Sequence, residues 1–221
     1  MTTIRAGTAK VSEQFGPDQI EAGRLLCAGP VSFVLGCAAL HQLPPGDRSE
    51  IAFAGRSNVG KSSLVNALVG RNKLARSSSE PGRTRELNYF DLGEGTLWLV
   101  DLPGYGYAKV SRTQAQAWMK LTRSYLRGRS SLRRVFLLVD SRRGIMKPDE
   151  EMMDMLDASA VIYQIVLTKS DKVKATSLED ILAKTQAVLK KRPAAHPLVH
   201  VTSSEKGYGL AELRAEVAAL V

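Results

Sequence analysis

The stretch Gly55-Arg-Ser-Asn-Val-Gly60-Lys61-Ser62 fits the pattern of a phosphate-binding loop, and it decides the fold class. The apolar run 51–54 precedes it and a helical pattern over 61–69 follows it, which is the strand–loop–helix context that the pattern requires. Glycines let a backbone wrap closely around phosphate oxygens, and the free N–H groups of a helix N-terminus attract the anion. We expect Lys61 to reach the β- and γ-phosphates of a nucleotide and Ser62 to ligate Mg²⁺. A glycine-rich turn that only caps a helix is the alternative interpretation.

Outward from this loop, apolar runs of strand length alternate with helical patterns. Strands that alternate with helices imply a mostly parallel sheet with helices on both faces, that is, a three-layer α/β/α fold. Ligands of such sheets bind beyond the carboxyl ends of the strands, so the loops there are expected to carry the chemistry. Residues 1–20 are predicted to form a flexible N-terminal arm, and residues 21–221 a single domain with its motifs within 51–207. Strands are predicted over 31–35, 51–54, 87–92, 96–100, 135–139, 161–167 and 198–201, and helices over 20–26, 61–69, 114–126, 149–156, 178–190 and 210–220.

A second phosphate element, Asp101-Leu102-Pro103-Gly104, follows the predicted strand 96–100. A carboxylate at a strand end can hold the magnesium shell, and the N–H of Gly104 can bond the γ-phosphate and sense its presence. An Asp-Pro-Gly turn is the alternative for so short a motif. The phosphate loop about 40 residues upstream favours the functional interpretation.

A base-reading element, Thr168-Lys169-Ser170-Asp171, ends the predicted strand 161–167 and favours GTP over ATP. The Asp171 carboxylate can accept both the N1–H and the 2-amino group of guanine, whereas adenine would leave it unpaired. An unpaired group in a binding site can cost a factor of about 10⁴ in discrimination. The Lys169 stem would cover the flat of the base. Thr202-Ser203-Ser204 follows the next strand, and its backbone can bond the guanine O6, although alone it is typical of a helix cap.

A polar loop, Ser77-Ser-Ser-Glu-Pro-Gly82-Arg83-Thr84-Arg85-Glu86, lies between the first helix of the motif and the next strand. Thr84 is the candidate for the second protein ligand of Mg²⁺, and Ser77 to Ser79 are its rivals. Such a loop is expected to close only when the γ-phosphate is present.

Tyr105 stands directly after Gly104, where some GTPases carry a glutamine that orients the attacking water. A tyrosine can hardly orient water in the same way, so intrinsic hydrolysis is expected to be slow. In related GTPases an asparagine at the position of Asn58 helps to hold a potassium ion against the phosphates, and a plain loop-stabilising asparagine is the alternative. The residues expected to take part in hydrolysis are Asn58, Lys61 and Thr84.

Five segments of the chain, taken together, resemble the motifs of the EngB (YihA or YsxC) family of bacterial GTPases, and the resemblance extends from about Pro30 to the last residue. The segments are GRSNVGKSSLVNAL, PGRTRELNYF, DLPGYGYA, TKSDK and SSEKGYG. The family lies in the TrmE-Era-EngA-EngB-Septin-like superfamily. The resemblance implies a Ras-like P-loop G domain, Mg²⁺ and GTP, and roles in assembly of the large ribosomal subunit and in cell division and septation. Ser62 and Thr84 match the family's magnesium ligands, beside Asp101. Arg85 departs from the pattern, because glutamine is common there. Nucleotide contacts are implied for Gly55, Arg56, Ser57, Asn58, Val59, Gly60, Lys61, Ser62, Ser63, Gly82, Arg83, Thr84, Arg85, Glu86, Asp101, Leu102, Pro103, Gly104, Thr168, Lys169, Ser170, Asp171, Thr202, Ser203 and Ser204.

The chain is basic, because 31 Lys and Arg against 22 Asp and Glu give a net charge of +9. A basic excess is the electrostatic footprint of a nucleic-acid binder, although many soluble proteins are basic without such a role. With the resemblance, the charge suggests the large ribosomal subunit and its rRNA as the partner; a GTPase that acts on another RNA or a regulatory partner is the alternative. Lysine and arginine residues group in three clusters along the chain, and the second cluster is the first candidate for RNA contact. A solvated face is the alternative for each cluster. The clusters are Arg71, Lys73 and Arg76; Arg123, Arg127, Arg129, Arg133 and Arg134; and Lys184, Lys190, Lys191 and Arg192.

Cysteine usage and hydropathy narrow the class of protein further. Cys27 and Cys37 lie in an apolar stretch without metal-ligand spacing and are expected to be buried reduced thiols. The uncharged stretch 25–40 is too short to span a bilayer and is broken by glycine and proline. A monomeric cytoplasmic protein with no membrane partner is expected, and the three histidines show no metal-ligand spacing.

Overall fold

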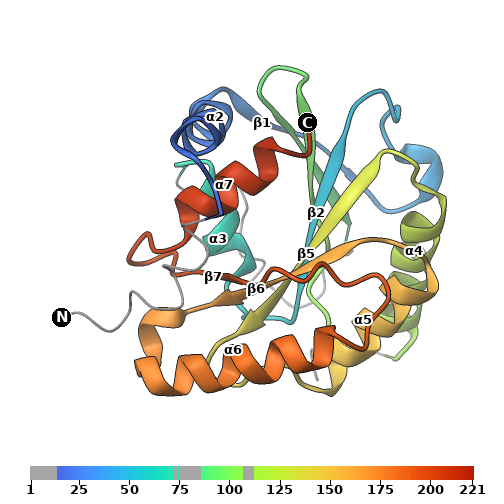
Figure 1. Ribbon diagram of the computed structural model, residues 1–221. Coiled ribbons are helices and arrows are strands. Elements are labelled where there is room, and N and C mark those ends of the chain that lie inside the picture. Colours follow the sequence, from blue (N-terminus) through green and yellow to red (C-terminus); the bar gives the residue numbers. More distant parts are fainter. Residues whose placement is uncertain (1–13, 72–73, 75–85, 107–111) are drawn as a thin grey trace.

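A seven-stranded sheet lies between two layers of helices in the computed structural model, which describes residues 14–71, 74, 86–106 and 112–221 (Figure 1). The spatial order of the strands is β1-β3-β4-β2-β5-β6-β7. The strand pairs β4–β2, β2–β5, β5–β6 and β6–β7 are parallel, whereas the pairs β1–β3 and β3–β4 are antiparallel. The predicted mostly parallel sheet is therefore confirmed. The strands are β1 (Val31–Cys37), β2 (Glu50–Gly55), β3 (Leu87–Leu92), β4 (Leu97–Asp101), β5 (Leu132–Asp140), β6 (Tyr163–Thr168) and β7 (His200–Val201).

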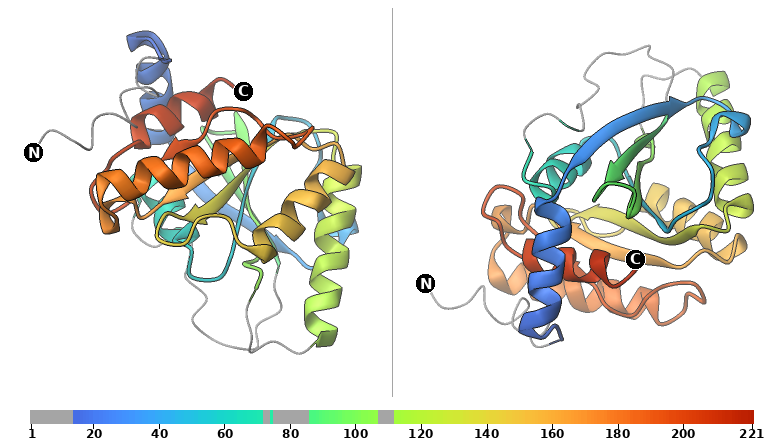
Figure 2. Two further views of the ribbon diagram at one scale, coloured as in Figure 1. Left: turned by 60° about the horizontal axis from the view of Figure 1, so that its bottom comes forward. Right: turned by 90° about the horizontal axis from the view of Figure 1, so that it is seen from above.

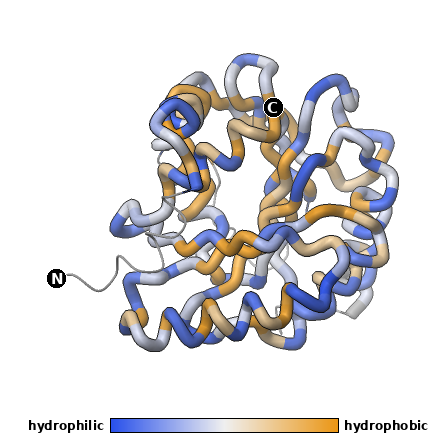
Figure 3. The backbone as a smooth tube through the Cα atoms, in the orientation of Figure 1, coloured by the Kyte–Doolittle hydropathy of each residue, from blue (hydrophilic) through white to orange (hydrophobic). Residues whose placement is uncertain are grey.

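Within the described ranges, three helices cover each face of the sheet (Figures 1 and 2). Successive side chains of a strand point to opposite faces, so Ile51 and Phe53 of β2 pack under α2, α3 and α7, while Ala52 and Ala54 pack under α4, α5 and α6. Apolar residues follow the central strands in Figure 3, as expected for strands buried on both faces. The helices are α2 (Pro17–Ala28), α3 (Lys61–Leu68), α4 (Arg112–Gly128), α5 (Lys147–Ala158), α6 (Ala175–Leu189) and α7 (Leu210–Ala218), with short 3₁₀ turns η1 (Leu40–Gln42) and η2 (Ser170–Lys172).

Helix α2 begins at Pro17, three residues before the predicted start, because proline is favoured at the first position of a helix. It packs against α7 through Gly23, which is buried. A Cβ atom on Gly23 would collide with the backbone of Arg214 and Ala215. The absence of a side chain at this position therefore allows the two helices to approach closely.

A buried carboxylate, Glu50, lies at the first residue of β2 and is fully inaccessible to solvent. Arg129 forms an ion pair with it, with its Nε 2.6 Å from the carboxylate. Tyr125 OH and Ser131 Oγ donate hydrogen bonds to it at 3.1 and 3.0 Å. A buried charge needs such partners, since an unpaired one costs several kcal/mol.

Arg134 forms a second buried ion pair, with Glu216 of α7, and donates to Gln164 Oε1 at 2.8 Å. Two of the five arginines in the second predicted basic cluster, Arg129 and Arg134, are thus occupied by buried carboxylates. The prediction that all five arginines form one surface cluster was therefore wrong. Their proximity in the sequence does not indicate which of their side chains point into the protein. Its exposed members are Arg123, Arg127 and Arg133.

Cys27 and Cys37 are buried free thiols, as predicted. Burial raises the pKa of Cys27 to about 11, so this thiol stays protonated. Among the helices in the described ranges, none is long and apolar enough to cross a membrane.

Candidate functional site

The phosphate loop joins β2 to α3, and its backbone depends on two residues with positive φ. Asn58 has φ 64° and Gly60 has φ 104°, and alternation of left- and right-handed residues turns successive N–H groups toward one side, as anion-binding loops do. A Cβ on Gly55 would lie 2.8 Å from Val59 Cγ1, so only glycine fits there. Residues 55–63 therefore occupy the strand–loop–helix unit that the sequence predicted.

Lys61 and Asp101 meet at the carboxyl edge of the sheet. Asp101 is the last residue of β4, which runs parallel to β2. The Lys61 ammonium forms an ion pair with the Asp101 carboxylate, and only 11% and 10% of these side chains are exposed. Leu102 and Pro103, which follow, are buried. The structure thus brings together the lysine of the first motif and the carboxylate of the second.

The segment after β4 is tied to the phosphate loop by backbone hydrogen bonds. Ser57 N–H donates to the Tyr105 carbonyl at 2.9 Å, and Tyr105 N–H donates to the Gly55 carbonyl at 3.3 Å. Gly104 directly precedes Tyr105 and lies close to Ser57, since a Cβ on it would be 3.2 Å from Ser57 Oγ. The two predicted phosphate elements are therefore one connected structure.

The base-reading loop contacts the phosphate loop from the other side. Thr168 Oγ1 donates to the Val59 carbonyl at 2.7 Å, and Lys169 Nζ donates to the Asn58 carbonyl at 2.6 Å. Lys169 itself has φ 57°, a conformation that costs a non-glycine residue free energy and needs support from its surroundings. Contacts between two loops supply this support.

Asp171 is held by the loop that follows β7. Ser203 Oγ donates to Asp171 Oδ1 at 2.6 Å, and Ser170 N–H donates to the Thr202 carbonyl at 3.1 Å. Donation from Ser203 lowers the pKa of Asp171, so the carboxylate is ionised at neutral pH and can accept hydrogen bonds. Thr202 and Ser203 are buried and Ser204 is half-buried. The two loops predicted to read a guanine are therefore adjacent.

Thr84 and its neighbours 82–85 lie outside the described residues, as do Ser77 to Ser79, so their contacts stay predictions. Glu86, the last residue of that predicted loop, is half-buried against β1. A Cβ on Gly36 of β1 would collide with the Glu86 carboxylate.

Sequence reasoning did not identify Asp140 as part of this site. This carboxylate is the last residue of β5 and lies 3.0 Å from Lys169 Nζ, and Arg142 donates to it from Nη2 at 2.7 Å. Burial would raise the pKa of Asp140, but Arg142 and Lys169 hold it well below its usual range. Its place at the carboxyl end of a parallel strand is the signal that could have found it.

The Tyr105 side chain points into the protein, toward α4 and α5. Its hydroxyl donates to Asp149 Oδ1 of α5 at 2.8 Å, and its ring stacks on Trp118 of α4 with centroids 6.3 Å apart. Burial raises the pKa of Tyr105 well above its usual value, so the hydroxyl stays protonated and donates. The residue in the glutamine position is therefore committed to an interior contact.

Comparison with known proteins identifies the family. The profile of the family described as 50S ribosome-binding GTPase matches residues 50–169. A probable GTP-binding protein EngB of Hyphomonas neptunium is 66% identical over 214 residues, which cover 96% of this chain and 97% of that protein. This chain belongs to the EngB family. An EngB relative from Caulobacter vibrioides is 55% identical over 93% of this chain and 90% of its own. The chain is accordingly a GTP-binding protein of a GTPase family.

Solved structures agree on the fold of this EngB chain. The crystal structure of a probable GTP-binding protein EngB superposes with a TM-score of 0.62 at 22% identity, over 78% of this chain and 98% of that one. A single-residue variant of Aquifex aeolicus Era bound to GDP.AlF4- superposes with a TM-score of 0.61 at 22% identity, over 79% of this chain and 57% of that one. These likenesses show an α/β Ras-like G domain.

Proposed function

We propose that this EngB chain binds GTP with Mg²⁺, hydrolyses it slowly to GDP, and acts as a switch in assembly of the large ribosomal subunit. The observation that carries the ribosomal part is the match over residues 50–169 to a family described as 50S ribosome-binding GTPase. The net charge of +9 supports it, because rRNA is a polyanion. The part in cell division and septation rests on the family resemblance alone.

Magnesium would be held by few protein groups. Within the described ranges, no group of three His, Cys, Asp or Glu side chains could hold a metal ion. The groups at the site that could ligate the ion are the Ser62 hydroxyl and the Asp101 carboxylate. They are oxygen ligands of the kind that Mg²⁺ takes together with nucleotide phosphates. Ser62 and Asp101 fit this role, and Thr84 would complete it. The ion would neutralise charge on the phosphates, and Lys61, now paired with Asp101, would turn to the β- and γ-phosphates.

Slow intrinsic hydrolysis is supported by the interior position of Tyr105. Its hydroxyl and its ring are both engaged by α5 and α4, so no side chain in the glutamine position faces an attacking water. Asn58 would hold a potassium ion against the phosphates and so replace a missing positive charge. Turnover measured in potassium and in sodium at equal ionic strength tests this role, and equal rates would refute it.

Sedimentation with large ribosomal subunits tests the proposed switch. The chain is spun with purified subunits in the presence of GDP, a non-hydrolysable GTP analogue or no nucleotide, over a series of salt concentrations. Co-sedimentation favoured by the analogue and lost steeply with salt is expected. A Lys61→Ala variant is the control for nucleotide dependence. No co-sedimentation in any state would leave a GTPase that acts on another RNA or a regulatory partner.

A further inference from the structure

Helix α4 has an unusual charge composition. It carries Arg112, Lys120, Arg123 and Arg127 and no acidic residue. Among the helices from α2 to α7, it alone combines several basic residues with no acidic one. Helix α5 is rich in acidic residues, and α6 mixes both signs. A helix face with one sign of charge attracts a polyanion.

The basic side chains of α4 share one exposed face. At about 100° per residue, Gln116, Lys120, Arg123 and Arg127 fall within an arc of about 60° on the helix. All four are exposed, whereas Trp118 on the opposite side is buried. No ion pair joins these three basic side chains to any other residue in the part of the chain that the structure describes.

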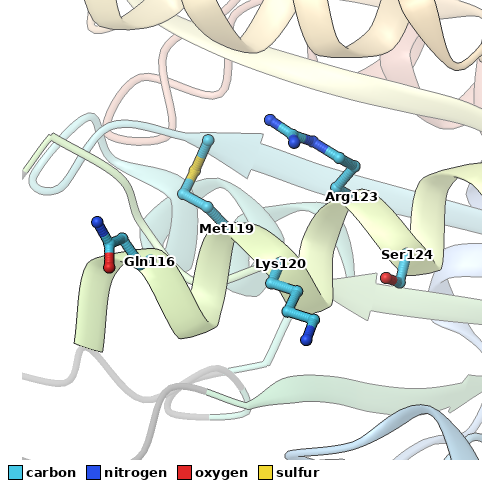
Figure 4. A pocket seen from close by; sticks show the side chains of 5 residues that line it. All are labelled: Gln116, Met119, Lys120, Arg123 and Ser124. Carbon is cyan, nitrogen blue, oxygen red and sulfur yellow. The ribbon is translucent and has the colours of Figure 1, made fainter. Parts of the chain in front are cut away.

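Figure 4 shows how this face is built. Met119 and Arg123 leave the helix on one side, and Lys120 and Ser124 leave it on the other. Together with Gln116 they line a shallow depression along α4. The cations that flank this depression form no ion pair with any described residue, and its polar members can donate hydrogen bonds to phosphate oxygens.

The face is connected to the nucleotide site through the interior of α4. Trp118 stacks on Tyr105, the residue that follows Gly104 and shares backbone hydrogen bonds with the phosphate loop. A change in the backbone around Gly104 would therefore reach α4 through one ring contact. Neither of the other basic clusters has such a contact among the described residues.

We propose that the α4 face, defined as Gln116, Lys120, Arg123 and Arg127, binds the phosphate backbone of RNA. From residue 120 to residue 127 the helix rises about 10 Å, a length over which one strand of a duplex presents about three phosphates. Three cations can therefore each meet a phosphate, without reading sequence. The inference deepens the proposed ribosomal function by naming the surface and the chemical group that it contacts.

Two charge-matched triple variants test the α4 face. The first is Lys120→Glu, Arg123→Glu and Arg127→Glu; the control is Lys184→Glu, Lys190→Glu and Lys191→Glu on and after α6, all exposed. Both change the net charge equally, so a general loss of attraction affects them alike. Binding to a generic RNA duplex is measured by anisotropy over a salt series, and binding to large subunits by sedimentation. A third variant, Lys120→Gln, Arg123→Gln and Arg127→Gln, removes the three charges without reversing them, so that the test does not depend on the Glu variant alone. The GTP affinity of each variant shows whether it is correctly folded.

The α4 Glu variant is expected to lose at least tenfold in affinity for both probes, and its salt dependence is expected to flatten by about two to three units of slope. The α6 control is expected to lose less than threefold. Equal losses in both variants would overturn the inference. Loss of subunit binding with unchanged duplex binding would also overturn it, because that result indicates a ribosomal protein as the contact.

The wild type separates this inference from the proposed function. If the wild type binds the duplex through α4 but not the subunits, the proposed function fails and the inference stands. If it binds neither the duplex nor the subunits, both fail.

Discussion

Asp171 sets base choice at the scale of a single residue, and its carboxylate is already oriented by Ser203. Asp171→Asn replaces an acceptor-only group with an amide. The amide would lose the bond to the 2-amino group of guanine, so GTP affinity is expected to fall by about 10²-fold or more. Xanthine carries an oxygen at that position, so affinity for XTP is expected to rise. Competition with a fluorescent nucleotide measures both.

Glu205→Gln is the matched control for this change, because Glu205 is exposed and pairs with Lys172 in the neighbouring loop. Its nucleotide preference is expected to match the wild type. An Asp171→Asn variant that keeps its preference for GTP would show that another group reads the base.

Arg129 illustrates how one residue compensates a buried charge. Arg129→Met removes the cation that pairs with the buried Glu50 carboxylate, and is expected to lower the free energy of unfolding by about 3–5 kcal/mol. Arg127→Met removes a positive charge from an exposed position nearby on the chain, and is expected to change it by about 0.5 kcal/mol or less. Urea denaturation of the two variants compares them. Equal stability of the two variants would mean that the ion pair between Arg129 and Glu50 does not stabilise the fold.

Gly23 decides the packing of two elements, α2 and α7. In an ordinary exposed helix, glycine to alanine adds about 1 kcal/mol of stability. Here Gly23→Ala is expected to destabilise by about 1–3 kcal/mol, because its Cβ would collide with the α7 backbone. Thermal unfolding measures the change.

Gly128→Ala at the end of α4 is the control for Gly23→Ala, since no described atom lies within 4 Å of its Cβ position. It is expected to be neutral or slightly stabilising. A stabilised Gly23→Ala variant would mean that α2 can move away from α7 at little cost.

Elements with strong local signals were predicted well from the sequence. The positions of the phosphate loop and of the buried strands could be predicted, because glycine spacing and unbroken apolar runs are local properties of the sequence. Helix α5 begins at Lys147 and ends at Ala158, whereas 149–156 was predicted, since helix ends depend on capping and tertiary contacts. The interior roles of Arg129 and Arg134 come from partners far away in the chain, and no local pattern reports them.

For the candidate site, the sequence identified the motifs but not the contacts between them. It placed Lys61, Asp101 and Asp171 in separate loops, and the parallel order of β4, β2, β5 and β6 brings those loops to one edge. The bridge from Lys169 to Asn58 and Asp140, and the inward direction of Tyr105, required the structure. The binding roles of all these residues stay predictions until nucleotide is bound.

The acid stability of the whole molecule depends on Glu216. Burial alone would raise the pKa of Glu216, but His200 and Arg134 beside it hold this pKa at about 2, below the ordinary value of 4.5. A depressed pKa contributes stability above about pH 4.5 that is lost as the pH falls toward 2, a contribution of about 3 kcal/mol. Glu216→Gln is expected to be less stable at neutral pH and to lose less stability between about pH 5 and pH 2. Urea midpoints across this range measure it, and parallel curves for the two proteins would contradict the assignment.

The ion pairs Arg129–Glu50 and Arg134–Glu216 lie at the amino ends of the parallel strands, since Glu50 begins β2 and Arg134 pairs in register with Ile51. At the opposite edge, loops are joined to one another by hydrogen bonds and by the ion pairs of Lys61 and Lys169. Amide protons at the amino edge should therefore exchange with solvent only when the whole chain unfolds, whereas those of residues 55–60 and 168–171 should exchange through local openings. GTP would slow exchange at the loop edge first, which makes deuterium uptake a map of where the nucleotide restrains the chain.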